Sequence, residues 1–161
     1  MNITEIIDPS GILSNLKVSN KNQLLKELSR AALRLIPPDA NGSERIIYDI
    51  LLERERLGTT GLGNGIAVPH GKLPRLKKII CIFARLETPI DFEAIDDQAV
   101  DLIFLLLAPE GAGADHLKAL ALISRLLRDS ATCEKLRGAT SADALYAIIV
   151  DKAATAVRAS R

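Results

Sequence analysis

The sequence predicts an α/β fold, a three-layer sandwich in which helices flank a mixed central β-sheet. Two apolar runs, residues 78–86 and 100–108, have the nearly continuous hydrophobic character of strands that are buried on both faces of a sheet. Amphipathic helical patterns lie before and after these runs. Alternation of helices, strands and helices is typical of a sheet that is covered by helices on both sides.

The N-terminal part is expected to contain a short strand at residues 15–18, followed by two amphipathic helices. The first helix begins after Ser19, a candidate N-cap, and two consecutive prolines follow its end at about Leu35. The second helix is capped by Ser43 and runs to about Arg56. Helical spacing places these residues on the buried faces: Leu24, Leu25, Leu28, Ala31, Ala32 and Leu35, then Ile46, Ile47, Ile50 and Leu51.

Two short strands and a third helix are expected around the long apolar runs. Residues 66–68 form a strand before the first run, and residues 89–92 add a short edge strand after it. Proline and glycine at residues 109–113 make a turn, and an amphipathic helix follows over residues 115–127. The positions expected on its core-facing side are Leu117, Leu120, Ala121, Ser124 and Leu127.

The chain is expected to end in two shorter helices, residues 131–137 and 142–150, with Ser141 as the cap of the second. No repeat, low-complexity tract or linker divides the 161 residues, which is an ordinary length for one domain. We therefore predict one domain over residues 1–151 and a frayed tail over residues 152–161.

Composition excludes several functional classes. The 21 basic and 20 acidic residues are well mixed, the net charge is +1 and 3% of the residues are aromatic, which argues against a nucleic-acid partner. The longest apolar stretch, residues 102–108, is too short to span a bilayer, and the N-terminus lacks the pattern of a signal peptide. We therefore expect a cytoplasmic protein without membrane insertion.

Cysteine and metal-ligand patterns are equally restrictive. Cys81 and Cys133 lack paired spacing, and Cys81 lies in an apolar run, so we expect two free thiols, of which at least one is buried. The two histidines have no cysteine or glutamate at zinc-ligand spacing. The nucleotide-binding sequence G-x-x-x-x-G-K-[ST] is also absent. Neither a metal nor a cofactor is expected.

The most distinctive segment is residues 58–71, which holds five of the ten glycines and contains His70, one of only two histidines. Pro69 fixes its own φ just before the histidine, and Gly71 has no Cβ, which leaves room for a reactant. An unperturbed imidazole titrates near ~6.5 and is largely neutral at neutral pH, so His70 is a candidate nucleophile that forms a phosphohistidine. The alternative is a surface histidine at the end of a strand.

The backbone N–H groups around Gly63, Asn64 and Gly65 are candidates for stabilising the phosphoryl group. His116 lies in the first turn of the helix after the second apolar run, where free N–H groups favour an anion. Taken alone, it is equally consistent with an ordinary polar residue of a first helical turn. Because both histidines follow a predicted strand near a glycine-rich turn, we expect them to share one site.

Several other charged residues lie near this segment. Arg54 and Arg56 lie near the end of the second helix, and either guanidinium could hold phosphoryl oxygens. The alternative is an exposed helix end, where arginines are common. The acidic pair at residues 96–97 is interpreted as a turn. We interpret a basic cluster as a solvated face that could steer a partner; it consists of Lys72, Arg75, Lys77 and Lys78.

These segments resemble the enzyme IIA domain of the fructose/mannitol type from the bacterial phosphoenolpyruvate-dependent phosphotransferase system. The resemblance covers about residues 5–150 and is carried by residues 54–71, 101–109 and 115–117. It is strongest to the nitrogen-regulatory branch, which has similar Gly-Asn-Gly-Ile-Ala-Val-Pro-His and Ala-Pro-Glu segments. The family's α/β sandwich with a mixed central sheet agrees with the fold predicted above.

The resemblance implies a role for three residues. His70 would be the residue phosphorylated, through Nε2, by a phosphorylated HPr-like carrier. Arg54 matches the family's active-site arginine, and His116 matches the second active-site histidine, which orients or stabilises the phosphoryl group.

Two functions remain open. The first is a phosphocarrier and regulatory protein that signals nitrogen, carbon or potassium status by binding regulatory target proteins according to its phosphorylation. The second is a sugar-specific enzyme IIA that passes phosphate to a separate fructose or mannitol permease component. The chain has no fused transporter domain, which favours regulation. Both are phosphotransferase activities with the same histidine chemistry.

Overall fold

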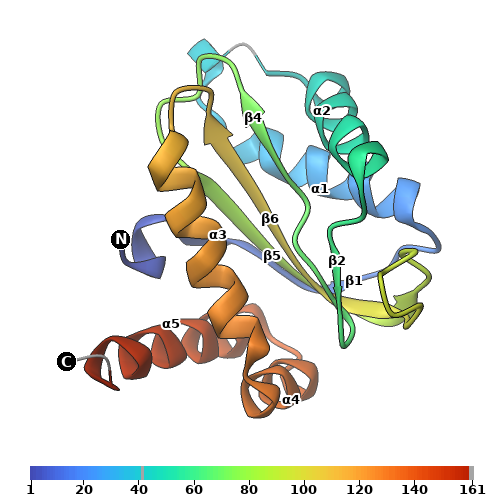
Figure 1. The fold of residues 1–161 in the computed structure, drawn as a ribbon, viewed down its shortest axis with the longest axis vertical. Helices are drawn as coiled ribbons and strands as arrows, with labels where there is room; N and C mark the ends of the chain where they lie inside the picture. The colour runs from blue at the N-terminus through green and yellow to red at the C-terminus, as the bar shows by residue number, and fades with distance from the viewer. Residues whose placement is uncertain (41, 160–161) are drawn as a thin grey trace.

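The computed structural model describes residues 1–40 and 42–159. Within these residues six strands form one mixed sheet in the order β1-β5-β6-β3-β2, and β4 also pairs with β6 (Figure 1). The strands are β1 (Ile7–Leu16), β2 (Gly61–Gly63), β3 (Ile66–Ala67), β4 (His70–Leu73), β5 (Ile80–Ile90) and β6 (Val100–Pro109). The helices are α1 (Lys21–Leu35), α2 (Glu44–Leu57), α3 (Gly113–Arg128), α4 (Ser130–Gly138) and α5 (Ala142–Ala159).

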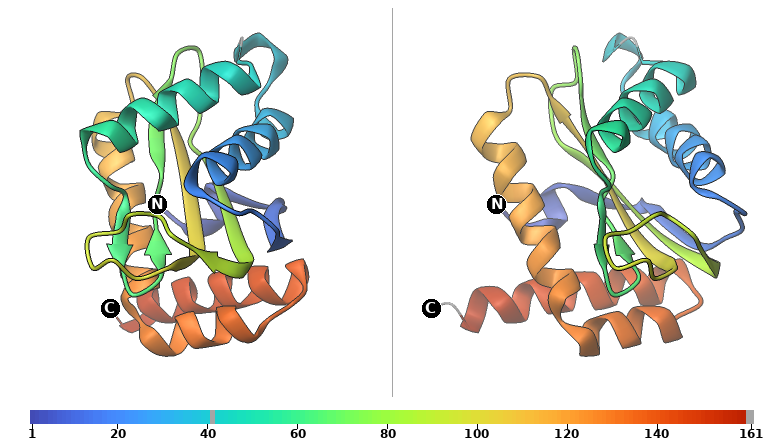
Figure 2. Two further views of the ribbon diagram at one scale, coloured as in Figure 1. Left: turned by 90° about the vertical axis from the view of Figure 1, so that its right-hand side faces the viewer. Right: turned by 45° about the vertical axis from the view of Figure 1, so that its right-hand side comes forward.

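Helices cover both faces of this sheet and give the molecule three layers. Helices α1 and α2 lie on one face, and α3, α4 and α5 lie on the other (Figure 2). Alternate side chains of β6 enter the two cores: Ile103 and Leu105 face α1 and α2, whereas Leu102 and Phe104 face the opposite layer. The predicted sandwich with a sheet buried on both faces is confirmed.

The chain runs twice along the same edge of β6 before it turns away. Both β3 and β4 are parallel to β6, with Ile66 opposite Leu102 and His70 opposite Leu106. Pro69 interrupts the two segments, and its carbonyl accepts a hydrogen bond from the Leu106 N–H (3.0 Å). His70 therefore begins a strand at the sheet edge, where both helical layers can reach it.

The first two helices agree with the sequence prediction apart from one cap and one side chain. The side chain of Asn20, not Ser19, caps α1 by accepting a hydrogen bond from the Gln23 N–H (2.8 Å). Ser43 caps α2 as predicted (3.1 Å to the Ile46 N–H). Ile46 itself is 44% exposed, because Ile47 is the residue of this turn that points into the core.

Three short or irregular strand segments differ from the sequence prediction. Strand β1 spans Ile7–Leu16 rather than residues 15–18. Its pairing with β5 contains register shifts, and these interrupt the alternation of apolar and polar residues that would indicate a strand in the sequence. The edge strand expected at residues 89–92 is wrong, because β5 continues without interruption to Ile90. Strand β2 was not predicted, since three residues with two glycines carry no strand signal.

The later helices differ from the prediction in orientation and length. The buried face of α3 consists of His116, Ala119, Ile123, Leu126 and Leu127, whereas Leu117 is 69% exposed and Ala121 is exposed. Apolar residues are so frequent in this helix that two of its faces have helical spacing. Packing against β6 buries the face that the sequence analysis did not choose. Helix α5 extends to Ala159 instead of ending at residue 150, so the backbone of residues 152–159 is helical rather than frayed. Residues 160–161 lie outside the described residues.

Both cysteines are free and buried, as the sequence predicted. Burial also raises the pKa of the Cys81 thiol far above its usual value. None of the described helices combines the length and the apolar character that crossing a membrane requires.

Candidate functional site

His70 is held in one tautomer by partners on both ring nitrogens. Its Nδ1 lies 2.8 Å from the Val68 carbonyl, which can only accept a hydrogen bond, so Nδ1 carries the proton. The Nε of Arg54 donates to the other nitrogen, Nε2, at 3.2 Å. A guanidinium can only donate, so Nε2 presents its lone pair. The imidazole is therefore arranged for nucleophilic attack through Nε2.

Close packing of α2 on β4 brings Arg54 to this ring. A Cβ on Gly71 would lie 2.4 Å from Cγ2 of Ile50, so only glycine allows the helix to approach the strand this closely. Arg54 lies one helical turn after Ile50, and its Nη1 also donates to the carbonyl of Gly58 (2.8 Å). The space beside Gly71 thus accommodates the helix rather than a reactant, which corrects the sequence interpretation.

The structure distinguishes the two arginines that the sequence left open. Arg56 points into solvent and forms an ion pair with Glu53. Arg54, in contrast, donates to Nε2 of His70. Of the two candidates, Arg54 is therefore the one that reaches the histidine.

A buried carboxylate that the sequence did not single out fixes the end of α2. Glu55 is 8% exposed and accepts hydrogen bonds from the N–H (2.8 Å) and hydroxyl of Thr60. The ammonium of Lys21 forms an ion pair with it at 2.8 Å and also lies 4.6 Å above the ring of Phe92. Every oxygen of Glu55 has a partner, which is what a buried charge requires. These contacts hold the turn that carries Arg54 in place.

His116 reaches the same site from the first turn of α3. The two imidazole rings meet edge to face, with centroids 5.5 Å apart and an interplanar angle of 87°. The structure thus brings together the two histidines that the sequence analysis assigned to one site. His116 is 8% exposed, and its Nε2 is buried without a hydrogen-bond partner among the described residues. A buried polar atom without a partner costs free energy, so Nε2 is available to a ligand of the site.

Both imidazoles are kept neutral by their surroundings. Burial is the main cause that lowers the pKa of His70, and the positive charge of Arg54 lowers it further. The hydrogen bond to Val68 acts in the opposite direction. Burial likewise lowers the pKa of His116, and the charge of Lys72 and the repulsion from a protonated His70 lower it further. Neutral imidazoles retain the lone pair that nucleophilic attack needs.

The glycine turn expected to stabilise a phosphoryl group lies elsewhere. Asn64 donates its N–H to Asp96 (2.9 Å), and the Gly65 carbonyl accepts from Asp101 (3.0 Å). Asp101 is five residues before the position on β6 that faces His70, which is about 16 Å along a strand. The structure therefore does not bring Gly63, Asn64 or Gly65 to the histidines.

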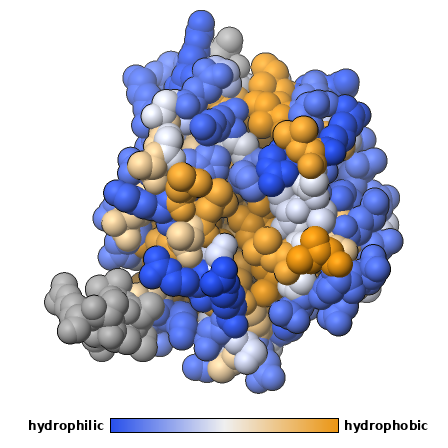
Figure 3. Space-filling view, viewed as in Figure 1, coloured by the Kyte–Doolittle hydropathy of each residue, from blue (hydrophilic) through white to orange (hydrophobic). Residues whose placement is uncertain are grey.

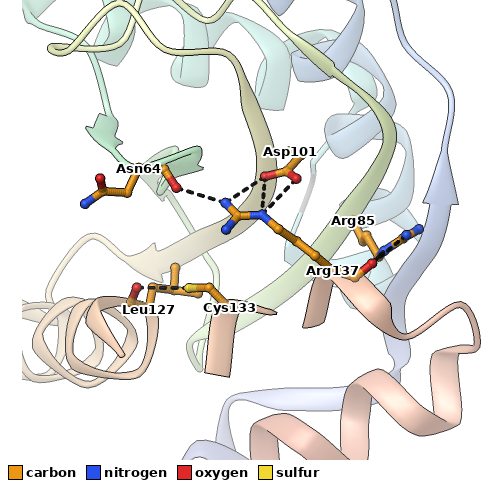
Figure 4. A network of polar contacts seen from close by, with 6 residues as sticks. All are labelled: Asn64, Arg85, Asp101, Leu127, Cys133 and Arg137. Carbon is orange, nitrogen blue, oxygen red and sulfur yellow. Dashed lines mark hydrogen bonds and ion pairs between the residues drawn. The ribbon is translucent and has the colours of Figure 1, made fainter. Parts of the chain in front are cut away.

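Arg137 explains the glycine sequence of this turn instead. Its guanidinium, at the end of α4, donates to both carboxylate oxygens of Asp101 (2.9–3.1 Å) and to the Asn64 carbonyl (2.9 Å) (Figure 4). A Cβ on Gly65 would lie 2.5 Å from Nη2 of Arg137. Gly63, Asn64 and Gly65 all have positive φ, as a tight turn requires.

Two leucines close in the chain to the candidate site residues are exposed. Leu57, three residues after Arg54, is 84% exposed, and Leu117, next to His116, is 69% exposed. In the view of Figure 3, apolar side chains reach the surface between α3 and the β2–β4 segment. Exposed apolar side chains of this kind are typical of a surface that binds another protein.

Comparison with known proteins identifies the family. The model of the phosphoenolpyruvate-dependent sugar phosphotransferase system, EIIA 2, matches residues 5–152. The chain belongs to this enzyme IIA family. It is 54% identical to a nitrogen regulatory protein of Bradyrhizobium diazoefficiens over 156 residues, which covers 97% of this chain and 99% of the relative. The resemblance read from the sequence, including the nitrogen-regulatory branch, is confirmed.

Solved structures agree with this assignment. The crystal structure of nitrogen regulatory protein IIA-Ntr from Neisseria meningitidis superposes with a TM-score of 0.84 at 33% identity, covering 91% of this chain and 98% of that one. A complex of enzyme IIA mannitol with phosphorylated enzyme IIB mannitol from Escherichia coli gives 0.73 at 20% identity, with 91% and 99% covered. The second comparison shows a shared fold. In the described part of the chain no group of histidine, cysteine and acidic side chains could hold a metal ion.

Proposed function

We propose that His70 accepts a phosphoryl group on Nε2 from the phosphohistidine of an HPr-like carrier, and that the phosphorylated protein acts as a regulator. The observation that carries the proposal is the fixed tautomer of His70, whose Nε2 accepts a hydrogen bond from a guanidinium and whose ring meets a second imidazole edge to face. Family membership supplies the reaction class, which is phosphotransfer.

The transfer needs no external proton donor. The Nε2 lone pair of His70 attacks phosphorus, the P–N bond of the carrier breaks, and its electron pair returns to the carrier imidazole. The Nδ1–H of His70 keeps its hydrogen bond to the Val68 carbonyl. This bond stabilises the positive charge that develops on the ring. Arg54 shifts from Nε2 to a phosphoryl oxygen, and Nε2 of His116 donates a hydrogen bond to another phosphoryl oxygen without giving up its proton.

The exposed leucines and the similarity to a nitrogen regulatory protein both support a regulatory role. A phosphoryl group adds about −2 charge at neutral pH. Here that charge would appear near the exposed leucines Leu57 and Leu117. Target proteins that bury these leucines would lose affinity, and proteins with a basic contact would gain it. The relative named a nitrogen regulatory protein supports such signalling of nitrogen, carbon or potassium status.

The alternative is a sugar-specific enzyme IIA that passes its phosphoryl group to a separate permease component. It is supported by the fold shared with an enzyme IIA mannitol that binds phosphorylated enzyme IIB. The chemistry at His70 is the same in both cases, and only the acceptor differs.

Phosphorylation is tested with purified protein, phosphoenolpyruvate, enzyme I and an HPr-type carrier. We expect one acid-labile phosphate on His70, none on the His70→Ala variant, and label on the matched His116→Ala variant at a reduced rate. Full labelling of His70→Ala would overturn the proposal. Pull-downs with His70→Ala and His70→Glu then separate regulator from carrier: identical partner sets would count against a phosphorylation-controlled switch.

A further inference from the structure

We propose that Lys72 is a second cationic contact of the phosphoryl group on His70. This inference rests on the proposed function and adds a residue to the same site. Sequence spacing alone does not distinguish this lysine from the other members of its exposed basic cluster.

Strand alternation places Lys72 on the same side of β4 as the reactive histidine. Leu73 is buried in the core under α1 and α2, and Gly71 packs against Ile50 of α2. Residues 70 and 72 therefore face the opposite layer. That layer is where the ring of His116 meets His70. The lysine and both histidines thus share one face of the edge strand.

The ammonium of Lys72 has no other partner in the described part of the chain. Lys21 is bound by Glu55 and Lys77 by Asp39, whereas no hydrogen bond or ion pair involves Lys72. Its charge is one of the causes that lower the pKa of His116, which agrees with the placement of both residues on the same side of β4. Lys72 is exposed and lies two residues after His70 on β4.

The charge of the phosphorylated site calls for such a group. A phosphoryl group on histidine carries about −2 charge near neutral pH. Arg54 supplies one positive charge and is tied on one side to the Gly58 carbonyl, and His116 is kept neutral by burial. Lys72 supplies the second charge, and its four-carbon stem allows it to meet the group as the carrier leaves. No bond to phosphorus involves it.

Lys72→Met tests the inference because it removes the charge and keeps the length of the side chain. Single-turnover transfer from the phosphorylated HPr-type carrier should slow about tenfold, which is the rate equivalent of one charge-assisted hydrogen bond. Lys72→Arg should restore most of the rate. The matched control is Lys77→Met, which removes the same charge from the same basic cluster but pairs with Asp39. It should transfer at the wild-type rate.

A second measurement separates contact from a general charge effect. In a 31P NMR titration the pKa of the phosphoryl group should rise in Lys72→Met and stay unchanged in Lys77→Met, because only Lys72 stabilises the dianion. Wild-type rate and titration in Lys72→Met would overturn the inference while leaving the labelling of His70 intact. A wild-type protein that takes no label would refute the proposed function itself.

Discussion

The two ends of the β3–β4 edge each receive an arginine from a helix, and the two arginines differ in how fully they are paired. Arg137 makes hydrogen bonds to both oxygens of Asp101 and to a backbone carbonyl. Arg54 contacts a neutral imidazole nitrogen at 3.2 Å, and the neighbouring His116 has an Nε2 without a partner among the described residues. This difference separates an end whose contacts stabilise the fold from the end that we propose binds the phosphoryl group. A polar network whose donors and acceptors are all paired has none left for a ligand, whereas an incompletely paired network can still bind one.

The largest effect, on the rate of transfer to His70, is expected when Arg54 is replaced. In Arg54→Met, transfer to His70 should slow at least about a hundredfold, because a donor aimed at the developing phosphoryl charge is lost. The free energy of unfolding should change by less than about 1 kcal/mol, since the lost hydrogen bonds are few and partly exposed. Single-turnover kinetics and urea unfolding measure the two quantities.

Arg56→Met is the matched control for this variant. Arg56 lies two residues later on the same helix, and its side chain is 64% exposed and, among the described residues, pairs with Glu53 alone. It should leave both rate and stability unchanged. Equal rates in the two variants would show that Arg54 is not part of the reaction.

The opposite pattern is expected at the completed end. Arg137→Met should lower the free energy of unfolding by about 2 kcal/mol, because Asp101 is left without its charged partner. Transfer to His70 should stay within about twofold of wild type, since the network lies about 16 Å along β6 from the ring. Arg125→Met, at an exposed position of α3, is the stability control. A slow but stable Arg137→Met protein would contradict the separation of the two ends.

The sequence predicted the layers of this fold better than its details. The two apolar runs that correspond to β5 and β6 correctly predict strands buried on both faces. Ser43 correctly predicts the start of α2. The buried face of α3 was placed wrongly because leucine spacing fits more than one stripe, and only contact with the sheet distinguishes them. Local pattern defines an element, and packing sets its rotation.

The site shows the same limit. His70, His116 and Arg54 were all selected from the sequence, and the structure brings them together. Gly63–Gly65 was assigned to the site because it is near His70 in the chain, yet β3 carries the chain away from that turn. Glu55 and Lys21 were missed since their contact joins two helices, and no spacing rule reports such a contact.

The smallest effect is expected from pH, which probes the neutral histidine pair without a phosphoryl donor. Both imidazoles have a lowered pKa in the folded protein, mainly because of burial, and titrate near ~6.5 when unfolded. The unfolded chain therefore takes up more protons as the pH falls below this value. The free energy of unfolding is fully retained above about pH 7 and decreases as the pH falls toward the lowered folded pKa values. Urea unfolding between about pH 5 and 8 measures this slope.

His116→Phe sharpens that test, because it keeps an aromatic ring and removes one titrating group. The slope should become shallower, and at about pH 8 the variant should be more stable by about 1 kcal/mol, since the partnerless buried Nε2 is gone. The lowered pKa values of Asp8, Asp96 and Asp129 fall well below this pH window and do not contribute to it. An unchanged slope would mean that His116 already has a partner, and the reason to regard this end of the edge as incomplete would be lost.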